Sequence, residues 1–336
     1  MVKKQSNAIL VGFGYWGPVL ARNISQSEHF NLYAILDSSE NKRVSARKLH
    51  PSAQILSNLD EISAEDIDVA FIATPSSTHF SISQFFLEKG IHVWVEKPAC
   101  LSAIEAETLC KIAENEGAQI VVDHPYVVHP ATEKIKELLR GEVLGKVFYF
   151  ESTRANLGIF QPDVSVLWDL VVHDLSILNT LFSDEKPKVI SSTAFNPLSN
   201  NSHRESMISV QLQYSNNVFC NLSSNWLSPI KVRRITIGGQ LGTVVFDDTQ
   251  SIEKVRIYNQ EFKATQTLEE TREMLISYIS GDISSPRVSG KEPIAIGMDL
   301  FGKQIREGIA SPNNLHSQLN VIRTLEEIQR KTVICE

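Results

Sequence analysis

The sequence predicts an α/β fold in which an N-terminal, doubly wound parallel Rossmann sheet is followed by an α+β domain with a large, open, mostly antiparallel sheet. Short apolar β-like runs alternate with helical patterns over the first 122 residues, as expected when helices cover both faces of a parallel sheet. A glycine-rich turn directly follows the first of these runs. After residue 124, alternating β segments follow one another with few helices between them, which is typical of antiparallel sheets.

The first domain is expected over residues 1–123. Apolar runs predict strands near 7–12, 31–36, 68–73, 91–95 and 119–122, and helical spacing predicts helices near 15–27, 39–49, 78–89 and 102–116. Ser102 and Glu105 have the spacing of a capping box, and Gly90 and Gly117 stand where glycines end helices.

A second domain is expected over residues 124–336. Its predicted strands lie near 189–195, 207–214, 218–224, 232–237, 243–246 and 254–258. Asn216-Asn217 and Gly238-Gly239 are interpreted as hairpin turns. Helices are predicted near 131–140, 165–181, 268–280, 293–309 and 314–331.

Composition narrows the classes of function. The chain has 336 residues, 42% of them hydrophobic and 21% charged, with a net charge of -7, so neither a basic nucleic-acid surface nor a membrane span is expected. The first apolar run is too short for a signal peptide, and we therefore expect a cytoplasmic protein. The four cysteines form no C-x-x-C pair, and no metal is predicted.

The strongest motif is the turn after the first strand, a G-x-G-x-x-G pattern that predicts a bound dinucleotide. Gly12 suits the tight turn, Gly14 lets backbone approach a pyrophosphate, and Gly17 lets the next helix pack closely. Amides at the helix N-terminus then hold the phosphates. The whole loop is expected to contact the cofactor: Gly12, Phe13, Gly14, Tyr15, Trp16 and Gly17.

Asp37 ends the second apolar run, twenty residues after the last glycine. A carboxylate at this position accepts hydrogen bonds from the adenosine ribose and repels a 2′-phosphate. NAD is therefore favoured and NADP is less favoured, although Lys42 and Arg43 lie just downstream and can soften the preference.

Two further loops follow predicted parallel strands, where doubly wound sheets bind their ligands. The first carries four expected cofactor contacts, Thr74, Pro75, Ser76 and His79, although a hydroxyl at 77 or 78 can simply cap the next helix. The second contains Glu96, Lys97 and Pro98. Glu96 and Lys97 are either a solvated ion pair or, at this strand end, cofactor contacts with an ammonium suited to proton transfer.

A third patch lies on the predicted helix 165–181. Asp169 and His173 are four residues apart and are expected on one face, each able to orient the other. An ordinary helical Asp-His pair is the alternative, but the apolar flank that includes Trp168 favours a functional pair. Asp174 points elsewhere and is expected to find a backbone or side-chain partner. Tyr126 and Arg154 are weaker substrate-binding candidates.

In order and approximate spacing, these motifs resemble the Gfo/Idh/MocA family (glucose–fructose oxidoreductase, inositol 2-dehydrogenase and rhizopine catabolism) along nearly the whole chain. The resemblance implies a nicotinamide cofactor lying between Lys97 and His173. It also implies that the domain 124–336 binds the substrate and forms a homodimer or homotetramer through its sheet. It also implies hydride transfer between nicotinamide C4 and a secondary alcohol carbon of a sugar, cyclitol or nucleotide-linked sugar.

The same resemblance implies the roles of the site residues. His173 is the acid/base, Lys97 stabilises the charge on the reacting oxygen, and Asp169 orients His173 or binds a sugar hydroxyl. Trp168 stands in a segment that departs from the Gly-rich Asp-x-Gly-x-His form of many members, which leaves the pocket shape open. Two alternatives remain: a dinucleotide-sensing regulatory protein of the same fold, and a reductase of C=N or conjugated bonds.

Overall fold

The structure is a computed structural model, which describes residues 5–157, 163–182, 186–197, 205–261, 267 and 282–335. The chain forms two compact units. Unit 1 comprises Met1–Val128 with Lys291–Arg323, and unit 2 comprises His129–Gly290 with Thr324–Glu336. The predicted helix at 268–280 lies outside the described residues.

Unit 1 is built on six parallel strands in the order β3-β2-β1-β4-β5-β6. Their bounds are β1 Ser6–Val11, β2 Phe30–Leu36, β3 Gln54–Leu56, β4 Val69–Ile72, β5 His92–Glu96 and β6 Ile120–Asp123. The order reverses between β1 and β4, where such sheets bind ligands beyond the carboxyl ends of their strands. The predicted parallel sheet is confirmed; only the three-residue edge strand β3, too short to show a period, was not predicted.

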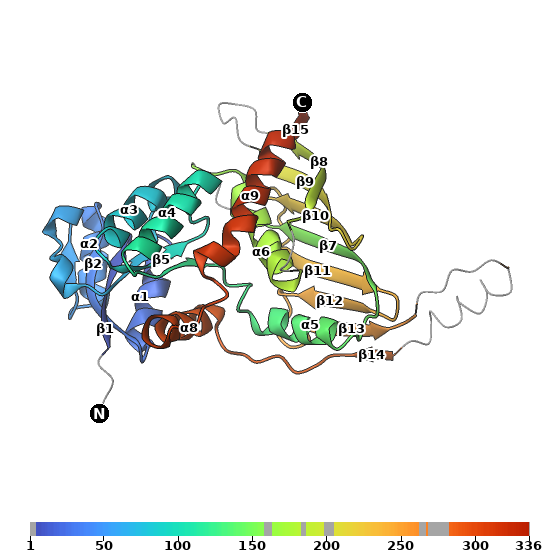
Figure 1. The fold of residues 1–336 in the computed structure, drawn as a ribbon, viewed down its shortest axis with the longest axis horizontal. Coiled ribbons are helices and arrows are strands. Elements are labelled where there is room, and N and C mark those ends of the chain that lie inside the picture. Colours follow the sequence, from blue (N-terminus) through green and yellow to red (C-terminus); the bar gives the residue numbers. More distant parts are fainter. Residues whose placement is uncertain are drawn as a thin grey trace. The chain divides into compact units, whose positions relative to one another are not determined.

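Helices cover both faces of this sheet. They are α1 Gly17–Gln26, α2 Glu40–Leu49, α3 His79–Leu87, α4 Ala103–Asn115, α8 Pro293–Glu307 and the first part of α9 Leu315–Lys331. Helix α3 packs with α4, and α1 packs with α8 on the other side of the strands (Figure 1). Ser102 caps α4 as expected, since its Oγ accepts a hydrogen bond from the Glu105 amide at 3.2 Å.

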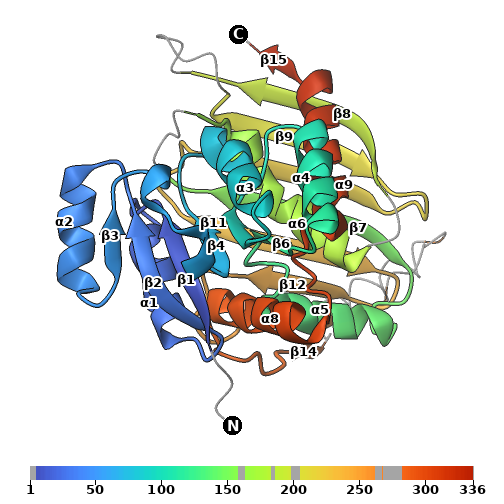
Figure 2. The same ribbon diagram turned by 60° about the vertical axis from the view of Figure 1, so that its left-hand side comes forward.

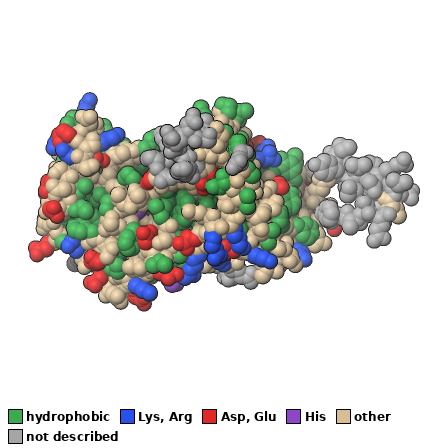
Figure 3. All heavy atoms as spheres, turned by 90° about the horizontal axis from the view of Figure 1, so that it is seen from above, with side chains coloured by type: hydrophobic (Ala, Val, Ile, Leu, Met, Phe, Trp, Pro, Cys, Tyr) green, Lys and Arg blue, Asp and Glu red, His purple; other side chains and the backbone are tan. Residues whose placement is uncertain are grey.

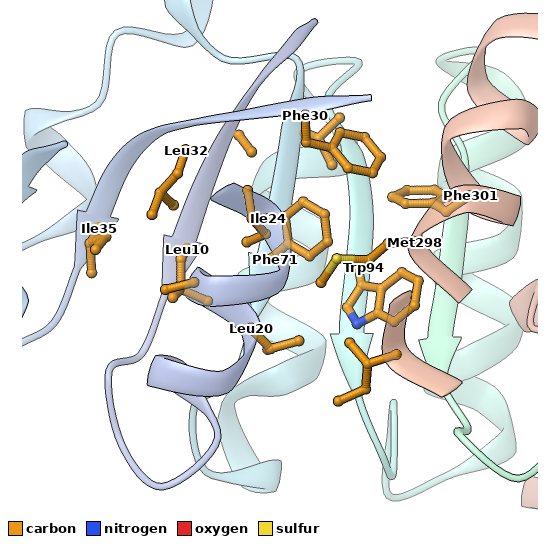
Figure 4. Packing of buried hydrophobic residues seen from close by; sticks show 14 of the residues in the cluster. Leu10, Leu20, Ile24, Phe30, Leu32, Ile35, Phe71, Trp94, Met298 and Phe301 are labelled. Atoms are coloured by element: carbon orange, nitrogen blue, oxygen red, sulfur yellow. The ribbon is translucent and has the colours of Figure 1, made fainter. Parts of the chain in front are cut away.

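The core of unit 1 contains a cluster of aromatic side chains through which α8 packs on the sheet. Figure 4 shows Phe301 of α8 facing Phe30 and Trp94, with ring centroids 5.9 and 5.8 Å away. Gly297 permits this approach, because a Cβ there would lie 2.7 Å from the Trp94 ring. Residues 291–323 thus pack in unit 1, whereas the sequence placed them in the second domain. Contacts between segments more than 200 residues apart leave no local pattern.

Unit 2 contains a nine-stranded sheet in the order β14-β13-β12-β11-β7-β10-β9-β8-β15. The bounds are β7 Val147–Ala155, β8 Lys188–Phe195, β9 Met207–Gln213, β10 Phe219–Asn225, β11 Val232–Gly239, β12 Thr243–Asp247, β13 Val255–Asn259, β14 Asp282–Ser284 and β15 Val333–Cys335. All neighbours are antiparallel except β7 with β10 and β8 with β15. The predicted open, mostly antiparallel sheet is confirmed.

Helices cover one face of this second sheet. Helix α5 Pro130–Arg140, helix α6 Val172–Leu181 and the end of α9 lie on the same side of the strands (Figure 2). Along β9 and β10 buried residues alternate with more exposed ones, so the other face is left uncovered by the described residues.

In unit 2, strand β7, the short edge strands β14 and β15 and one turn differ from what the sequence predicted. The central strand β7 was not predicted, because Ser152 and Arg154 on its buried side hide the apolar alternation. Gly238 and Gly239 end strand β11 instead of forming the turn, which lies at 240–242. A Cβ on Gly238 would lie 2.1 Å from the Tyr149 ring, so packing explains this glycine.

Surface charge is mixed: Figure 3 shows acidic side chains among basic ones on one face of the molecule. Within the described part of the chain, no helix has both the length and the apolar character needed to cross a membrane.

Candidate active site

The glycine-rich turn joins β1 to α1, and of its three glycines only one has room for a Cβ atom. A Cβ on Gly12, whose φ is 96°, would lie 2.6 Å from the Ala73 carbonyl oxygen, and one on Gly17 would lie 2.6 Å from the Gly12 carbonyl oxygen. A Cβ on Gly14 would meet no described atom within 4 Å. The turn is therefore closed against its own sheet and open at Gly14, as a loop that cradles a pyrophosphate must be.

The start of α1 suits an anion. No described side chain caps its first turn, so its N-terminal amides and dipole remain available for phosphate. Tyr15 is 77% exposed and Trp16 is 43% exposed, and their rings meet edge to face at 5.5 Å. These two aromatic side chains border the open side of the turn.

Asp37 lies just beyond β2 and holds the glycine-rich turn in place. Its Oδ2 accepts a hydrogen bond from the Phe13 amide at 2.7 Å, and its Oδ1 accepts one from the Ser39 amide at 2.8 Å. Each carboxylate oxygen has a second lone pair, so the carboxylate can still accept the ribose hydroxyls.

Arg43 is already engaged by its own loop. Its guanidinium donates to the carbonyl oxygens of Asp37 and Ser38, both at 2.8 Å, and pairs with the Glu40 carboxylate. The guanidinium of Arg43 is therefore occupied by oxygen atoms of its own loop and by Glu40.

The loop after β4 contains Thr74 and Pro75 and is tied to itself and to the loop after β5. The Thr78 hydroxyl donates to the Pro75 carbonyl oxygen at 2.7 Å, and its oxygen lies 2.8 Å from the Thr74 Oγ1. His79 is 1% exposed, and its ring lies between the carbonyl oxygens of Thr74 and Pro98.

The ends of β5 and β6 bring two carboxyl groups together. Glu96 and Asp123 are register partners on neighbouring parallel strands, both are buried, and their side chains hydrogen-bond each other. Burial and the Asp123 charge raise the pKa of Glu96 well above its usual value, and burial raises the pKa of Asp123 to about 7. The pair therefore holds a proton near neutral pH, directly before Lys97, whose bond to Pro98 is cis.

His124 follows Asp123 and is 2% exposed. Burial and the Lys97 charge lower the pKa of His124 to about 3, so its imidazole is neutral at physiological pH. Sequence reasoning missed both Asp123 and His124, although the rule used for Lys97, polar groups at the carboxyl end of a parallel strand, points to them as well.

In unit 2, Asp169 lies in a π turn, Leu167–Val171, that precedes α6. The sequence predicted a regular helix here, with Asp169 and His173 on one face; in a π turn the hydrogen bonds run from i to i+5, so that spacing no longer fixes the face. The Asp169 Oδ2 accepts from the Trp226 indole at 2.9 Å. Sequence reasoning missed Trp226, which lies 57 positions away.

Trp168 is buried, and its indole donates to the Gln329 Oε1 of α9 at 2.6 Å. Arg154 is also buried, and its Nε donates to the Asp174 carboxylate at 2.7 Å. Asp174 thereby has the side-chain partner that the sequence analysis expected; burial raises the pKa of Asp174 although the Arg154 charge opposes this effect.

Tyr126 lies in unit 1, in the segment after β6, and is 6% exposed. His173 is half-buried near the start of α6 in unit 2. The structure thus groups Gly12–Gly17, Asp37, the loop after β4 and Lys97 at the carboxyl edge of one sheet, and it places Asp169 and His173 in the other unit.

Comparisons with known proteins agree with this architecture. A family model described as an oxidoreductase family with an NAD-binding Rossmann fold (GFO_IDH_MocA) matches residues 6–124. A second model, the GFO/IDH/MocA C-terminal domain, matches residues 132–245. The two models together cover most of the chain.

Two relatives and one solved structure illustrate the range of similar proteins. UDP-N-acetylglucosamine 3-dehydrogenase of Acidithiobacillus ferrooxidans is 28% identical over 183 residues, 54% of this chain and 55% of the relative, so the match spans about half the length of that enzyme. 2,7-Anhydro-N-acetylneuraminate hydratase of Mediterraneibacter gnavus is 24% identical over 84% of this chain and 78% of its own. A mutant of KijD10, a 3-ketoreductase from Actinomadura kijaniata solved with TDP-benzene and NADP, has a TM-score of 0.82 at 12% identity and covers 98% of this chain and 99% of its own, which shows the fold.

Proposed function

Because the chain belongs to the Gfo/Idh/MocA family of oxidoreductases, whose N-terminal domain is an NAD-binding Rossmann fold, we propose that it transfers a hydride between nicotinamide C4 and the secondary alcohol or ketone carbon of a sugar, cyclitol or nucleotide-linked sugar. The observation that carries the proposal is the placement of Lys97 at the carboxyl end of β5, in the same sheet as the open glycine-rich turn. The name of one relative, UDP-N-acetylglucosamine 3-dehydrogenase, supports the substrate class.

The proposed cofactor is NAD, with NADP disfavoured. Asp37 places a carboxylate beyond β2, and its two oxygens are fixed by the amides of Phe13 and Ser39. The Arg43 side chain, which the sequence left as a possible partner of a 2′-phosphate, donates to carbonyl oxygens and to Glu40. A fixed carboxylate and an engaged arginine both favour the free 2′-hydroxyl of NAD.

Three side chains are proposed to handle the reacting alcohol. The nicotinamide supplies the hydride acceptor. As the C–H electron pair leaves with the hydride, the imidazole of His173 takes the O–H proton and the C=O bond forms; reduction returns that proton. The Lys97 ammonium hydrogen-bonds the same oxygen and stabilises its negative charge, and Asp169 orients His173 or binds a neighbouring hydroxyl.

Absorbance of the reduced nicotinamide tests the proposal, with NADH or NADPH and a panel of keto and hydroxy forms of sugars, inositols and nucleotide-linked sugars. We expect turnover with one substrate class, a preference for NADH, and a loss of at least about 100-fold in Lys97→Ala, since a donor to the reacting oxygen is removed. Lys89→Ala is the matched control, because Lys89 lies over the Phe85 ring at the far end of α3.

The alternatives give different results in the same assay. Tight cofactor binding without turnover on any substrate supports the dinucleotide-sensing protein. Turnover confined to C=N or conjugated bonds supports a reductase of such bonds. These substrates belong in the panel because the chain is 31% identical to mouse biliverdin reductase A over 55% of its own length.

A further inference from the structure

His79 connects two loops that carry proposed site residues. It is the first residue of α3, and its ring is buried at 1% exposure. The Nε2 lies 2.9 Å from the carbonyl oxygen of Thr74, in the loop after β4. The Nδ1 lies 2.8 Å from the carbonyl oxygen of Pro98, in the loop after β5. One side chain therefore spans the carboxyl ends of two neighbouring strands.

Both of these contacts are with carbonyl oxygens, which restricts the protonation state of the ring. A carbonyl oxygen can only accept, and a neutral imidazole has one N–H, whereas an imidazolium has two. A neutral ring would direct a lone pair at an oxygen less than 3 Å away, inside a buried site where an unsatisfied polar group is costly. Only the imidazolium satisfies both contacts at once.

Two other histidines of this chain show the opposite arrangement. The Nδ1 of His92 accepts from the Gln119 amide at 3.0 Å, and the Nδ1 of His129 accepts from the Ala131 amide at 3.0 Å. An accepting nitrogen carries no proton, so these two rings are neutral and have their proton on Nε2. Burial lowers the pKa of both groups, that of His129 to about 4.

The carbonyl groups that the ring holds are adjacent to the proposed chemistry. Pro98 follows Lys97 directly, and Thr74 precedes Pro75 in the loop that borders the switch point. The Thr78 hydroxyl closes the same loop through Thr74 and Pro75. The position of Lys97 thus depends on a backbone that His79 ties to the neighbouring loop.

We propose that His79 is a buried imidazolium that clamps the loop after β4 to the loop after β5, and that it acts as a positioning residue for Lys97 instead of touching the cofactor. The part that concerns Lys97 rests on the proposed function, whereas the charge and the clamp do not.

The charge is tested on the wild-type protein by ¹⁵N NMR of histidine side chains at neutral pH. We expect both ring nitrogens of His79 to carry protons, while His92 and His129 each show one protonated and one bare nitrogen. His79→Gln assigns the signal by its disappearance. A neutral His79 ring under conditions in which His92 and His129 are also neutral would overturn the proposal.

The clamp is tested with His79→Phe, which keeps a ring but no donor, and His79→Gln, which keeps an amide donor. We expect faster hydrogen exchange in the loops 73–78 and 97–100, with exchange in β4 and β5 unchanged, and about tenfold weaker NADH binding in the Phe variant. Partial rescue by Gln is expected, and His92→Phe, which alters the amino end of β5, is the matched control.

The hydrogen-exchange and NMR results on His79 can be obtained whether or not the protein is a dehydrogenase. Unchanged exchange in both loops of His79→Phe overturns the clamp, whatever the enzyme does. If His79→Phe does not fold, the wild-type spectrum still decides the charge. Exchange in the two loops of His79→Gln then decides the clamp: it should be faster than in the wild type, because the amide has one nitrogen where the ring has two, and unchanged exchange overturns the clamp. If wild-type protein binds no nicotinamide cofactor, the proposed function fails while the spectrum and the exchange data still test His79.

Discussion

At the scale of single residues, three buried titratable groups act together with the half-buried Lys97 at the carboxyl edge of the parallel sheet. Lys97 is preceded by Glu96, which shares a proton with Asp123 on the next strand, and His124 remains neutral beside them. The pair and the ammonium belong to one local charge system, because the Lys97 charge acts on all three groups. A buried acid pair of this kind costs stability and is retained where it sets the environment of a functional charge.

The Asp123 carboxyl predicts a pH dependence of folding. Its pKa is raised to about 7 in the folded protein and is about 3.9 in the unfolded chain. The folded state therefore binds more protons between these values, and the free energy of unfolding falls as pH rises from about 4 to about 7. In Asp123→Asn this contribution, on the order of a few kcal/mol, is lost, and urea unfolding across that range should show a flatter profile.

Asp299→Asn is the control for that measurement, because the pKa of Asp299 is lowered by its Lys303 and His29 partners, with burial opposing them. Its contribution has the opposite sign: it is present above the unfolded pKa and is lost as pH falls. An Asp123→Asn profile as steep as that of the wild type would contradict the shared proton.

At the scale of elements, two indole groups make hydrogen bonds that fix the π turn before α6. Trp226 of the β10 end donates to Asp169, and Trp168 donates to Gln329 of α9. π turns occur frequently at functional sites, and here the widened turn carries the carboxylate that is proposed to orient His173. Both indoles fix the same turn, but only that of Trp226 donates to Asp169.

This difference gives a prediction with an internal control. Trp226→Phe keeps the packing and removes the donor to Asp169, so we expect kcat to fall about tenfold with cofactor affinity unchanged, since a hydrogen bond to a charged group is lost. Trp168→Phe removes a bond that does not reach Asp169 and should change the melting temperature more than kcat. Equal losses of kcat in the two variants would show that the indoles serve only the fold.

The elements also show what sequence can and cannot predict. The strand and turn at Gly12 could be predicted, because local sterics select glycine there. Asp37 could be predicted too, because one helix and one strand set its distance from the turn. Strand β7 was not readable, because Arg154 on its buried side has its partner, Asp174, twenty residues away. The packing of Phe301 on Phe30 and Trp94 depends on chain closure over long separations, which leaves no periodic signal.

At the scale of the whole molecule, the uncovered face of the nine-stranded sheet is the proposed oligomer interface. Exposed apolar side chains on this sheet include Ile190, Met207 and Phe219, each about 40% exposed. A sheet of this size with such residues on one face favours association. We expect sedimentation or light scattering to give the mass of a dimer or a tetramer; a stable monomer of 37.6 kDa at micromolar concentration would contradict the proposal.

Deuterium transfer tests the central claim most directly. NADH carrying deuterium at both C4 positions is offered with the keto substrate found in the absorbance assay, and the product is analysed by mass spectrometry and NMR. We expect one deuterium on the new carbinol carbon with the wild-type protein and none with Lys97→Ala over the same time. Deuterium at the carbon of a reduced C=N or C=C bond, or a product without deuterium, would contradict hydride transfer to a sugar ketone.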